Sequence, residues 1–156
     1  MNSIEIKYKI LEYSDFYRED QVLIDKAKAA MDKAHAPYSK FHVGSAVQLE
    51  DGTYYTGNNQ ENAAYPSGLC AERVALFAAK SQTKQPIETI AIVARNAHQQ
   101  AADAFACGSC RQVMLEYSSL QPAAIRVIMG NHSGQYVVVE DVRSLLPFSF
   151  DSSTLG

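Results

Sequence analysis

The sequence is poor in several features that mark whole classes of protein. It has no tryptophan, and its eight glycines and five prolines in 156 residues exclude a collagen-like or low-complexity chain. No apolar run approaches the roughly 20 residues of a membrane span, and Met1–Lys7 lacks the basic-then-apolar pattern of an export signal. The three cysteines cannot form a closed set of disulfides. We therefore expect a cytoplasmic protein that does not bind membranes.

Neither sign of charge dominates the composition. The chain has 14 Lys and Arg against 17 Asp and Glu, which gives a formal net charge of −3 at pH 7. A mildly acidic chain without a basic run is a poor candidate for binding nucleic acid. Hydrophobic residues make up 47% of the sequence, and the length suits one domain whose core needs no disulfides. We expect a single domain over residues 1–156.

Hydrophobic spacing alternates between helical and strand-like segments. Helices are expected over residues 19–36, 69–80 and 108–117, a helical turn within 142–150, and strands over residues 41–49, 53–56, 89–94, 125–129 and 136–139. The run 89–94 is almost continuously apolar, which is typical of a strand covered on both faces. This order favours an α/β layered domain with a mixed sheet. Residues 1–18 alternate weakly, as a short edge strand would, and form an N-terminal extension of unknown role.

The placement of the cysteines is the main chemical signal. Cys107 and Cys110 form a Cys-x-x-Cys pair, and Cys70 precedes it by 37 residues. Cys70 and Cys107 fall at the expected starts of two helices, where free N–H groups and the helix dipole favour thiolates. Three such thiolates could hold Zn²⁺, and the sequence shows no fourth ligand at zinc-ribbon spacing. A site with three protein ligands leaves open the position that a catalytic zinc needs for water.

Two charged residues follow the first cysteine. Glu72 lies two positions after Cys70, close enough to move protons beside the metal without being a ligand. Arg73 could offset part of the negative charge of three thiolates. A zinc ion held by cysteines, a nearby glutamate and a Cys-x-x-Cys pair are the characteristic features of a zinc deaminase site.

Four motifs in order give this pattern a specific resemblance. They are Pro37–Gly44, Asn59–Tyr65, Cys70–Arg73 and Cys107–Gln112. Together they resemble cytidine deaminases of the small, homotetrameric, zinc-dependent type, and the similarity covers roughly residues 20–150. The resemblance implies a three-layer α/β/α sandwich with a mixed sheet, and hydrolytic deamination of cytidine and deoxycytidine in pyrimidine salvage. It also implies one Zn²⁺ per subunit and a small pyrimidine nucleoside as the substrate.

The resemblance also assigns roles to the residues of the metal centre. Cys70, Cys107 and Cys110 match the family's zinc ligands, and Glu72 matches its proton shuttle. Arg73 matches an arginine that moderates the charge of the thiolates.

Further residues match the family's substrate contacts. Phe41 matches the aromatic side chain that packs on the base, Asn59 and Glu61 match the residues that bind the sugar hydroxyls, and Ala71 matches a substrate contact. In that family a C-terminal aromatic residue of a neighbouring subunit covers the base. Phe150 is the expected match, with Phe148 as the alternative, so the resemblance implies a homotetramer with shared sites.

The sequence departs from the family pattern at two positions, both of which carry alanine. Ala106 stands where a proline commonly precedes the Cys-x-x-Cys pair, and Ala64 stands where serine is common. Neither change removes a ligand. None of the four histidines has zinc-ligand spacing to a cysteine, so we expect them at the surface or as satisfied polar groups; they are His35, His42, His98 and His132.

Other interpretations of the cysteines stay open from the residues alone. Each could be a small buried hydrophobe, or Cys107 and Cys110 could be a thioredoxin-like redox pair, which leaves Cys70 and Glu72 without a role. A structural zinc closed by a distant histidine would make the chain a binding or assembly module. Among enzymes, the alternative is a deaminase of another cytosine compound, such as a nucleoside antibiotic or a nucleotide.

Overall fold

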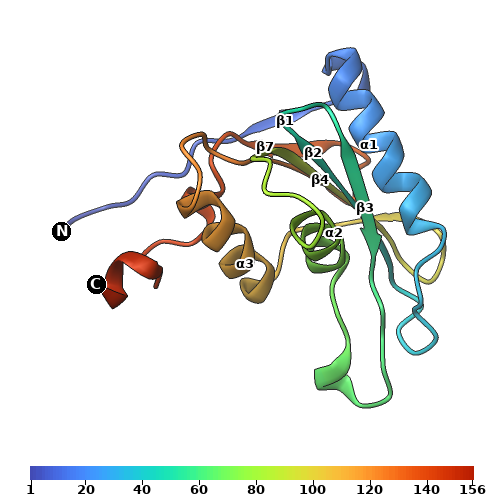
Figure 1. Ribbon diagram of the computed structural model, residues 1–156. Coiled ribbons are helices and arrows are strands. Elements are labelled where there is room, and N and C mark those ends of the chain that lie inside the picture. Colours follow the sequence, from blue (N-terminus) through green and yellow to red (C-terminus); the bar gives the residue numbers. More distant parts are fainter.

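Seven strands form one mixed sheet that carries helices on both faces (Figure 1). The computed structural model describes all of residues 1–156. The strand order is β1-β7-β6-β4-β2-β3, β5 pairs with β4 beyond the end of β6, and only β4 and β6 run parallel. The strands are β1 (Lys9–Leu11), β2 (His42–Leu49), β3 (Tyr54–Asn58), β4 (Ile87–Arg95), β5 (Ala101–Ala102), β6 (Arg126–Gly130) and β7 (Tyr136–Val139).

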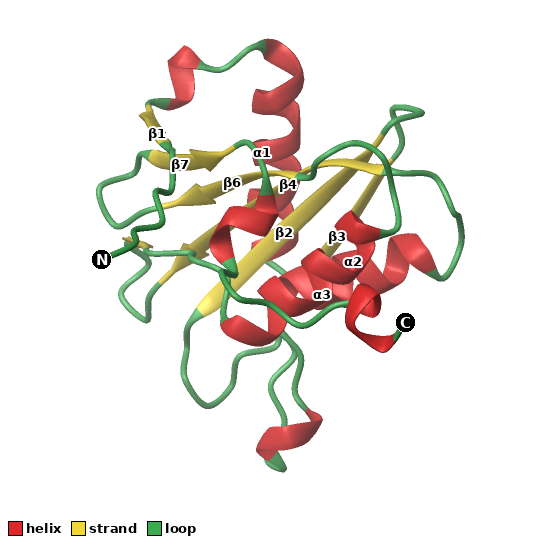
Figure 2. Cartoon of the chain, turned by 90° about the vertical axis from the view of Figure 1, so that its left-hand side faces the viewer, coloured by secondary structure: helices red, strands yellow, loops and turns green.

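Alternate residues of the central strands point into two separate cores. In β4, Ile90 and Ile92 join the larger core, whereas Ala91 and Val93 join the smaller one. Helices α2 (Ala71–Lys80) and α3 (Gly108–Ser119) cover the larger core, and α1 (Arg18–Met31) covers the smaller one, as Figure 2 shows. The fold is therefore the expected three-layer α/β/α sandwich with a mixed sheet.

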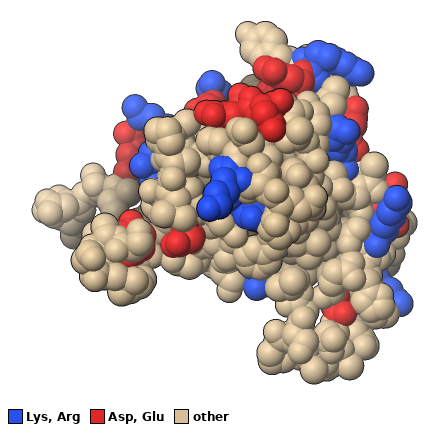
Figure 3. Space-filling model, in the orientation of Figure 1, with Lys and Arg blue, Asp and Glu red and all other residues tan.

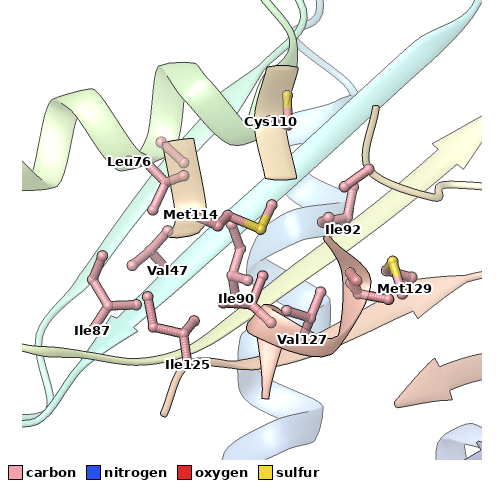
Figure 4. Close-up of a cluster of buried hydrophobic side chains, with 14 of the residues drawn as sticks. Val47, Leu76, Ile87, Ile90, Ile92, Cys110, Met114, Ile125, Val127 and Met129 are labelled. Atoms are coloured by element: carbon pink, nitrogen blue, oxygen red, sulfur yellow. The ribbon is translucent and has the colours of Figure 1, made fainter. Parts of the chain in front are cut away.

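The larger core lies directly beneath the helices that carry the cysteines (Figure 4). Leu76 of α2 and Met114 of α3 are fully buried against Ile90 and Val127 of the sheet. Cys110 belongs to the same cluster, at the N-terminal end of α3. Packing of these apolar side chains thus fixes the ends of both helices relative to each other.

Two glycines allow the helices to approach the sheet closely. A Cβ atom on Gly44 would lie 2.0 Å from the carbonyl oxygen of Ala27 in α1, and one on Gly57 would lie 2.4 Å from the backbone nitrogen of Ala75 in α2. Only glycine fits at such distances. Gly57 therefore sets the depth at which α2, with Cys70 at its start, rests on β3.

The structure corrects the expected C-terminal end of the first helix. We expected this helix to continue to Pro37, but α1 ends at Met31. The backbone of His35 pairs with the strand-like segment 59–61, donating to the carbonyl of Asn59 and accepting from the N–H of Glu61. Long-range backbone pairing thus ends the helix before the proline is reached.

The N-terminal segment contributes to the sheet over a shorter stretch than its pattern suggests. Only β1 pairs, antiparallel to β7, whereas residues 1–8 are extended and have no strand partner. Phe16 is buried and packs edge-on against Tyr136, with ring centroids 5.5 Å apart. The expected edge strand is therefore present, and the residues that follow it belong to the smaller core.

The distribution of surface charge and the character of the helices match what the composition predicts. On the face seen in Figure 3, acidic and basic side chains are interspersed and form no continuous basic surface. None of the helices combines the length and the apolar character that a membrane span requires.

Candidate active site

Two helix N-termini bring the three cysteines together. Cys70 is the N-cap of α2, Cys107 is the N-cap of α3, and Cys110 lies in the first turn of α3. Their Sγ atoms all lie within 4.8 Å of one another, and those of Cys70 and Cys107 are 3.8 Å apart. Both helix dipoles therefore present their positive ends to the same sulfur cluster.

The cluster has the dimensions of a zinc site. Tetrahedral Zn²⁺ with Zn–S bonds of about 2.3 Å separates neighbouring sulfurs by about 3.8 Å. The sulfurs of Cys70 and Cys107 have this separation. The cluster contains the three cysteines and no histidine, aspartate or glutamate as a further ligand. Three protein donors leave a coordination position for water, the arrangement of catalytic rather than structural zinc.

The three sulfurs can all be thiolates only when a cation balances their negative charge. Hydrogen bonds from Cys110 and Arg73 lower the pKa of Cys70 to about 5, against the effect of burial. The same hydrogen bond, together with burial and the nearby carboxylate of Glu72, raises the pKa of Cys110. One thiolate therefore forms readily, whereas further thiolates beside it require a compensating positive charge. Nη2 of Arg73, 3.6 Å from Sγ of Cys70, supplies part of that charge.

Glu72 lies beside the sulfur cluster and is almost removed from solvent. Only 4% of the residue is exposed. Burial raises the pKa of its carboxyl group to about 7, and the negative charge of Cys70 contributes to this increase. A carboxyl group with such a pKa can both take up and release a proton near neutral pH.

A cavity of about 810 Å³ opens beside this cluster. This volume is within the range of small-molecule sites. Seven of the ten residues that the sequence assigned to the site line the cavity: Phe41, Asn59, Glu61, Cys70, Glu72, Arg73 and Cys107. Val43 and Ile92, on adjacent strands β2 and β4, add apolar surface. The cavity thus combines a reactive polar end with an apolar wall.

Residues 59–61, which follow β3, hold the segment that carries Phe41 in place through hydrogen bonds. Asn59 accepts a hydrogen bond from the backbone N–H of Val43 and donates one to the carbonyl of Phe41, each at 2.8 Å. Glu61 accepts hydrogen bonds from the backbone N–H groups of Tyr38 and Ser39 and from the hydroxyl of Ser39. Despite some burial, these hydrogen bonds lower the pKa of Glu61, so its carboxylate stays charged.

A family model matches the part of the sequence that builds this site. The model describes the zinc-binding region of cytidine and deoxycytidylate deaminases, and it matches residues 17–123. The chain belongs to this deaminase family. Zinc is therefore the metal of the centre, and the three clustered cysteines are the residues able to hold it.

Full-length relatives and solved structures agree with this membership of the deaminase family. The cytidine deaminase of Halalkalibacterium halodurans is 40% identical over 87% of this chain and 97% of its own, and that of Sporosarcina psychrophila is 38% identical over 86% and 93%. The crystal structure of cytidine deaminase from Burkholderia pseudomallei superposes with a TM-score of 0.72 at 40% identity, covering 83% of this chain and 97% of that one. The corresponding structure from Mycobacterium tuberculosis gives 0.64 at 32% identity, covering 83% and 94%.

Three site residues expected from the deaminase resemblance do not line the cavity. Cys110 lies beneath it in the core, and Ala71 is fully buried at the start of α2. Phe150 is 58% exposed, and its carbonyl accepts a hydrogen bond from Gln112 on the outside of α3. Phe148 is almost fully exposed. The tail of this deaminase-family chain therefore leaves its own cavity uncovered.

None of the four histidines belongs to the sulfur cluster of the deaminase fold. Nδ1 of His132 lies 2.9 Å from Asp103, and Nδ1 of His42 lies 3.0 Å from the carbonyl oxygen of Lys40. A structural zinc closed by a distant histidine therefore has no support in this geometry.

Sequence reasoning missed several residues of this deaminase cavity. Tyr38, Ser39 and Tyr65 belong to motifs that were recognised, but Asp103 and Phe105 carried no signal. These two residues lie in an irregular segment where hydrophobic periodicity gives no information. Only the position of Phe105, directly before the segment that contains the Cys-x-x-Cys pair, could have indicated proximity to the metal.

Proposed function

We propose that this chain is a zinc-dependent hydrolase that deaminates cytidine and deoxycytidine to uridine and deoxyuridine, with release of ammonia, in pyrimidine salvage. The observation that carries the proposal is a buried Glu72 beside three clustered thiols at the reactive end of an 810 Å³ cavity. The names of the relatives support the same reaction.

In this proposal the residues of the metal centre have two roles, zinc binding and charge compensation. Cys70, Cys107 and Cys110 hold one Zn²⁺ per subunit, and Arg73 moderates the charge of the thiolates. When bound, Zn²⁺ acts as a Lewis acid that makes water a nucleophile at neutral pH.

Glu72 carries the protons of the reaction. Its carboxylate takes the proton that water loses as the oxygen bonds to C4 of the cytosine ring, and gives that proton to N3. It then takes the proton of the new hydroxyl group and delivers it to the amino group, so that the C4–N bond breaks and ammonia leaves. A pKa of about 7 suits both directions of transfer.

The residues around the cavity hold the nucleoside. Phe41 offers an aromatic face to the base, while Glu61 and the free N–H of the Asn59 amide serve the sugar hydroxyls. Ala71, whose methyl group is buried, acts through its backbone at the start of α2. These roles use both the polar and the apolar residues that line the cavity.

The larger organisation is part of the same proposal. We assign residues 1–156 to a single domain that assembles into a cytoplasmic homotetramer. The exposed ring of Phe150, with Phe148 as the alternative, covers the site of a neighbouring subunit. The open mouth of the cavity in the isolated chain supports this assignment, because Tyr38 and Phe105 at its border are also exposed.

The test combines an ultraviolet assay on cytidine, product identification by chromatography and a zinc count in the same sample. We expect conversion to uridine with one zinc per chain. Glu72→Gln should keep the zinc and lose about a thousandfold in kcat, because the amide cannot carry a proton. Glu116→Gln on the exposed face of α3 is the matched control and should change nothing. Preference for cytidine monophosphate over cytidine, or full activity of Glu72→Gln, would contradict the proposal.

A further inference from the structure

The N-terminal arm, residues 1–8, is the largest feature that the proposed deaminase does not use. It is extended, exposed and without a strand partner, and Figure 1 shows it leaving the body of the molecule beyond β1. It also lies outside the region that matches the deaminase family model. None of its residues lines the cavity.

The arm and β1 together present one continuous apolar stripe. Ile4, Ile6, Tyr8 and Ile10 alternate with polar residues and therefore share one face of an extended chain. All four are between 40% and 61% exposed. A stripe of this kind contributes nothing to the core of its own chain, and exposed apolar strands of this length tend to pair with another strand.

The opposite face of the arm carries charges of both signs. Glu5 and Lys7 follow each other there, and Lys9 pairs with Glu140 of its own chain at 3.5 Å. Edge strands are commonly protected against pairing by lysine and other charges, by proline or by bulges. The arm has no proline, and its neighbouring charges of opposite sign can pair with those of a second copy.

The charge pattern is self-complementary in one antiparallel register. When the pairing is centred on Ile6, Glu5 of each copy faces Lys7 of the other, Ile4 faces Tyr8, and the two Ile6 side chains meet on the two-fold axis. Centring on Glu5 places Glu5 opposite Glu5. Centring on Lys7 pairs Glu5 with Lys9 but places Lys7 opposite Lys7. Centring between residues places apolar side chains opposite charged ones. Parallel pairing in register repeats every like-charge contact.

We propose that the arm pairs with the arm of a second copy of this chain, as an antiparallel strand pair centred on Ile6. The pair extends both sheets through β1, whose outer edge has no partner within the chain. Such an isologous contact is the usual symmetry of soluble oligomers. It is small, so the association is weak and depends on concentration.

Covalent trapping tests the register directly. Ile6→Cys places two thiols opposite each other, and mild oxidation of the zinc-loaded protein with diamide should give a crosslinked dimer on a non-reducing gel. Ile10→Cys is the matched control, because it is on the same face and 52% exposed but faces Asn2 in this register. We expect Ile6→Cys to crosslink about tenfold faster, since pairing raises the local thiol concentration. The parent chain sets the background from its own cysteines.

Charge reversal in the Ile6→Cys chain tests the complementarity. Glu5→Lys alone or Lys7→Glu alone should slow crosslinking about tenfold, because the two-fold axis doubles each repulsion. The two reversals together should restore the original rate. Equal crosslinking of Ile6→Cys and Ile10→Cys, or a double reversal as slow as the single ones, would overturn the proposal. Deamination by all these variants should match that of the parent chain, so failure of the pairing leaves the proposed activity untouched.

Discussion

The three cysteines differ in their surroundings, and Cys110 gives the sharpest test of metal ligation. Cys107 is exposed and Cys70 is half-buried, whereas Cys110 is fully buried in the larger core. Cys110→Ala removes one sulfur of the cluster and only a small volume of the core. We expect purified Cys110→Ala to hold well under one zinc per chain and to lose deamination, measured by metal analysis and the cytidine assay.

Ser109→Ala is the matched control for this substitution. Ser109 lies in the same turn of α3, but its side chain is exposed and outside the cluster. It should keep full zinc and activity. Circular dichroism of both variants separates metal loss from unfolding, and a folded Cys110→Ala with one zinc per chain would remove Cys110 from the ligand set.

Ser39 is a positioning residue for the carboxylate that we assign to the sugar. Its hydroxyl and its backbone N–H both donate to Glu61. Ser39→Ala removes one of these bonds and leaves the carboxylate freer to rotate. We expect KM for cytidine to rise about fivefold with little change in kcat, which corresponds to one hydrogen bond of ordinary strength. Ser67→Ala, in an exposed turn at the end of the same loop, should leave both constants unchanged. A fall in kcat alone would contradict this role.

Residues with motif spacing could be predicted, and residues placed only by tertiary structure could not. Cys70, Glu72 and Phe41 were found because helix starts and ordered motifs mark their positions in the chain. Asp103 and Phe105 reach the cavity because β5 pairs with β4 directly before them. A two-residue strand leaves no periodic signal, so this part of the wall was invisible in the sequence.

Helix α2 transmits its packing directly to the metal centre. Its first turn holds Glu72, its N-cap is Cys70, and Gly57 of β3 lies against its backbone. Gly57→Ala would place a Cβ atom 2.4 Å from the backbone nitrogen of Ala75, which forces the helix outward. We expect a loss of about 1–3 kcal/mol in the free energy of unfolding, together with weaker zinc binding, measured by chemical denaturation and metal competition.

Gly130→Ala is the matched control for this substitution. Gly130 is also buried in the sheet, but a Cβ atom there would have neighbours no nearer than 3.6 Å, an ordinary contact. It should cost much less stability and leave zinc affinity unchanged. Equal effects of the two substitutions would mean that the depth of α2 does not control the site.

Element types followed from periodicity, whereas some boundaries depended on distant partners. The apolar run in β4 predicted the central strand correctly because a strand covered on both faces has no polar alternation. The predicted end of α1 was wrong because the backbone of His35 pairs with segment 59–61, a contact that local sequence does not encode. The edge strand was confirmed, but only Lys9–Leu11 has a partner in β7.

At the level of the whole molecule, the proposed tetramer accounts for both the open cavity and the exposed C-terminal tail. Phe150 is exposed on the outside of α3, and the cavity of the same chain has no aromatic cover from the tail. In the proposed homotetramer, Phe150 covers a neighbouring site. Light scattering should therefore give about 69 kDa, four times the 17.2 kDa of one chain. An active monomer would contradict the shared site.

Mixed assemblies distinguish a shared site from a merely structural tail. Phe150→Ala alone should raise KM for cytidine about tenfold, because burial of an aromatic ring against the base is lost, and Glu72→Gln alone should be inactive. When the two chains are co-expressed, a Phe150→Ala chain supplies an intact Glu72 while its Glu72→Gln neighbour supplies Phe150. Such hybrids should contain sites with the native KM, which neither parent has. Phe148→Ala in place of Phe150→Ala tests the alternative residue. If no mixture contains sites with the native KM, neither ring acts across the interface.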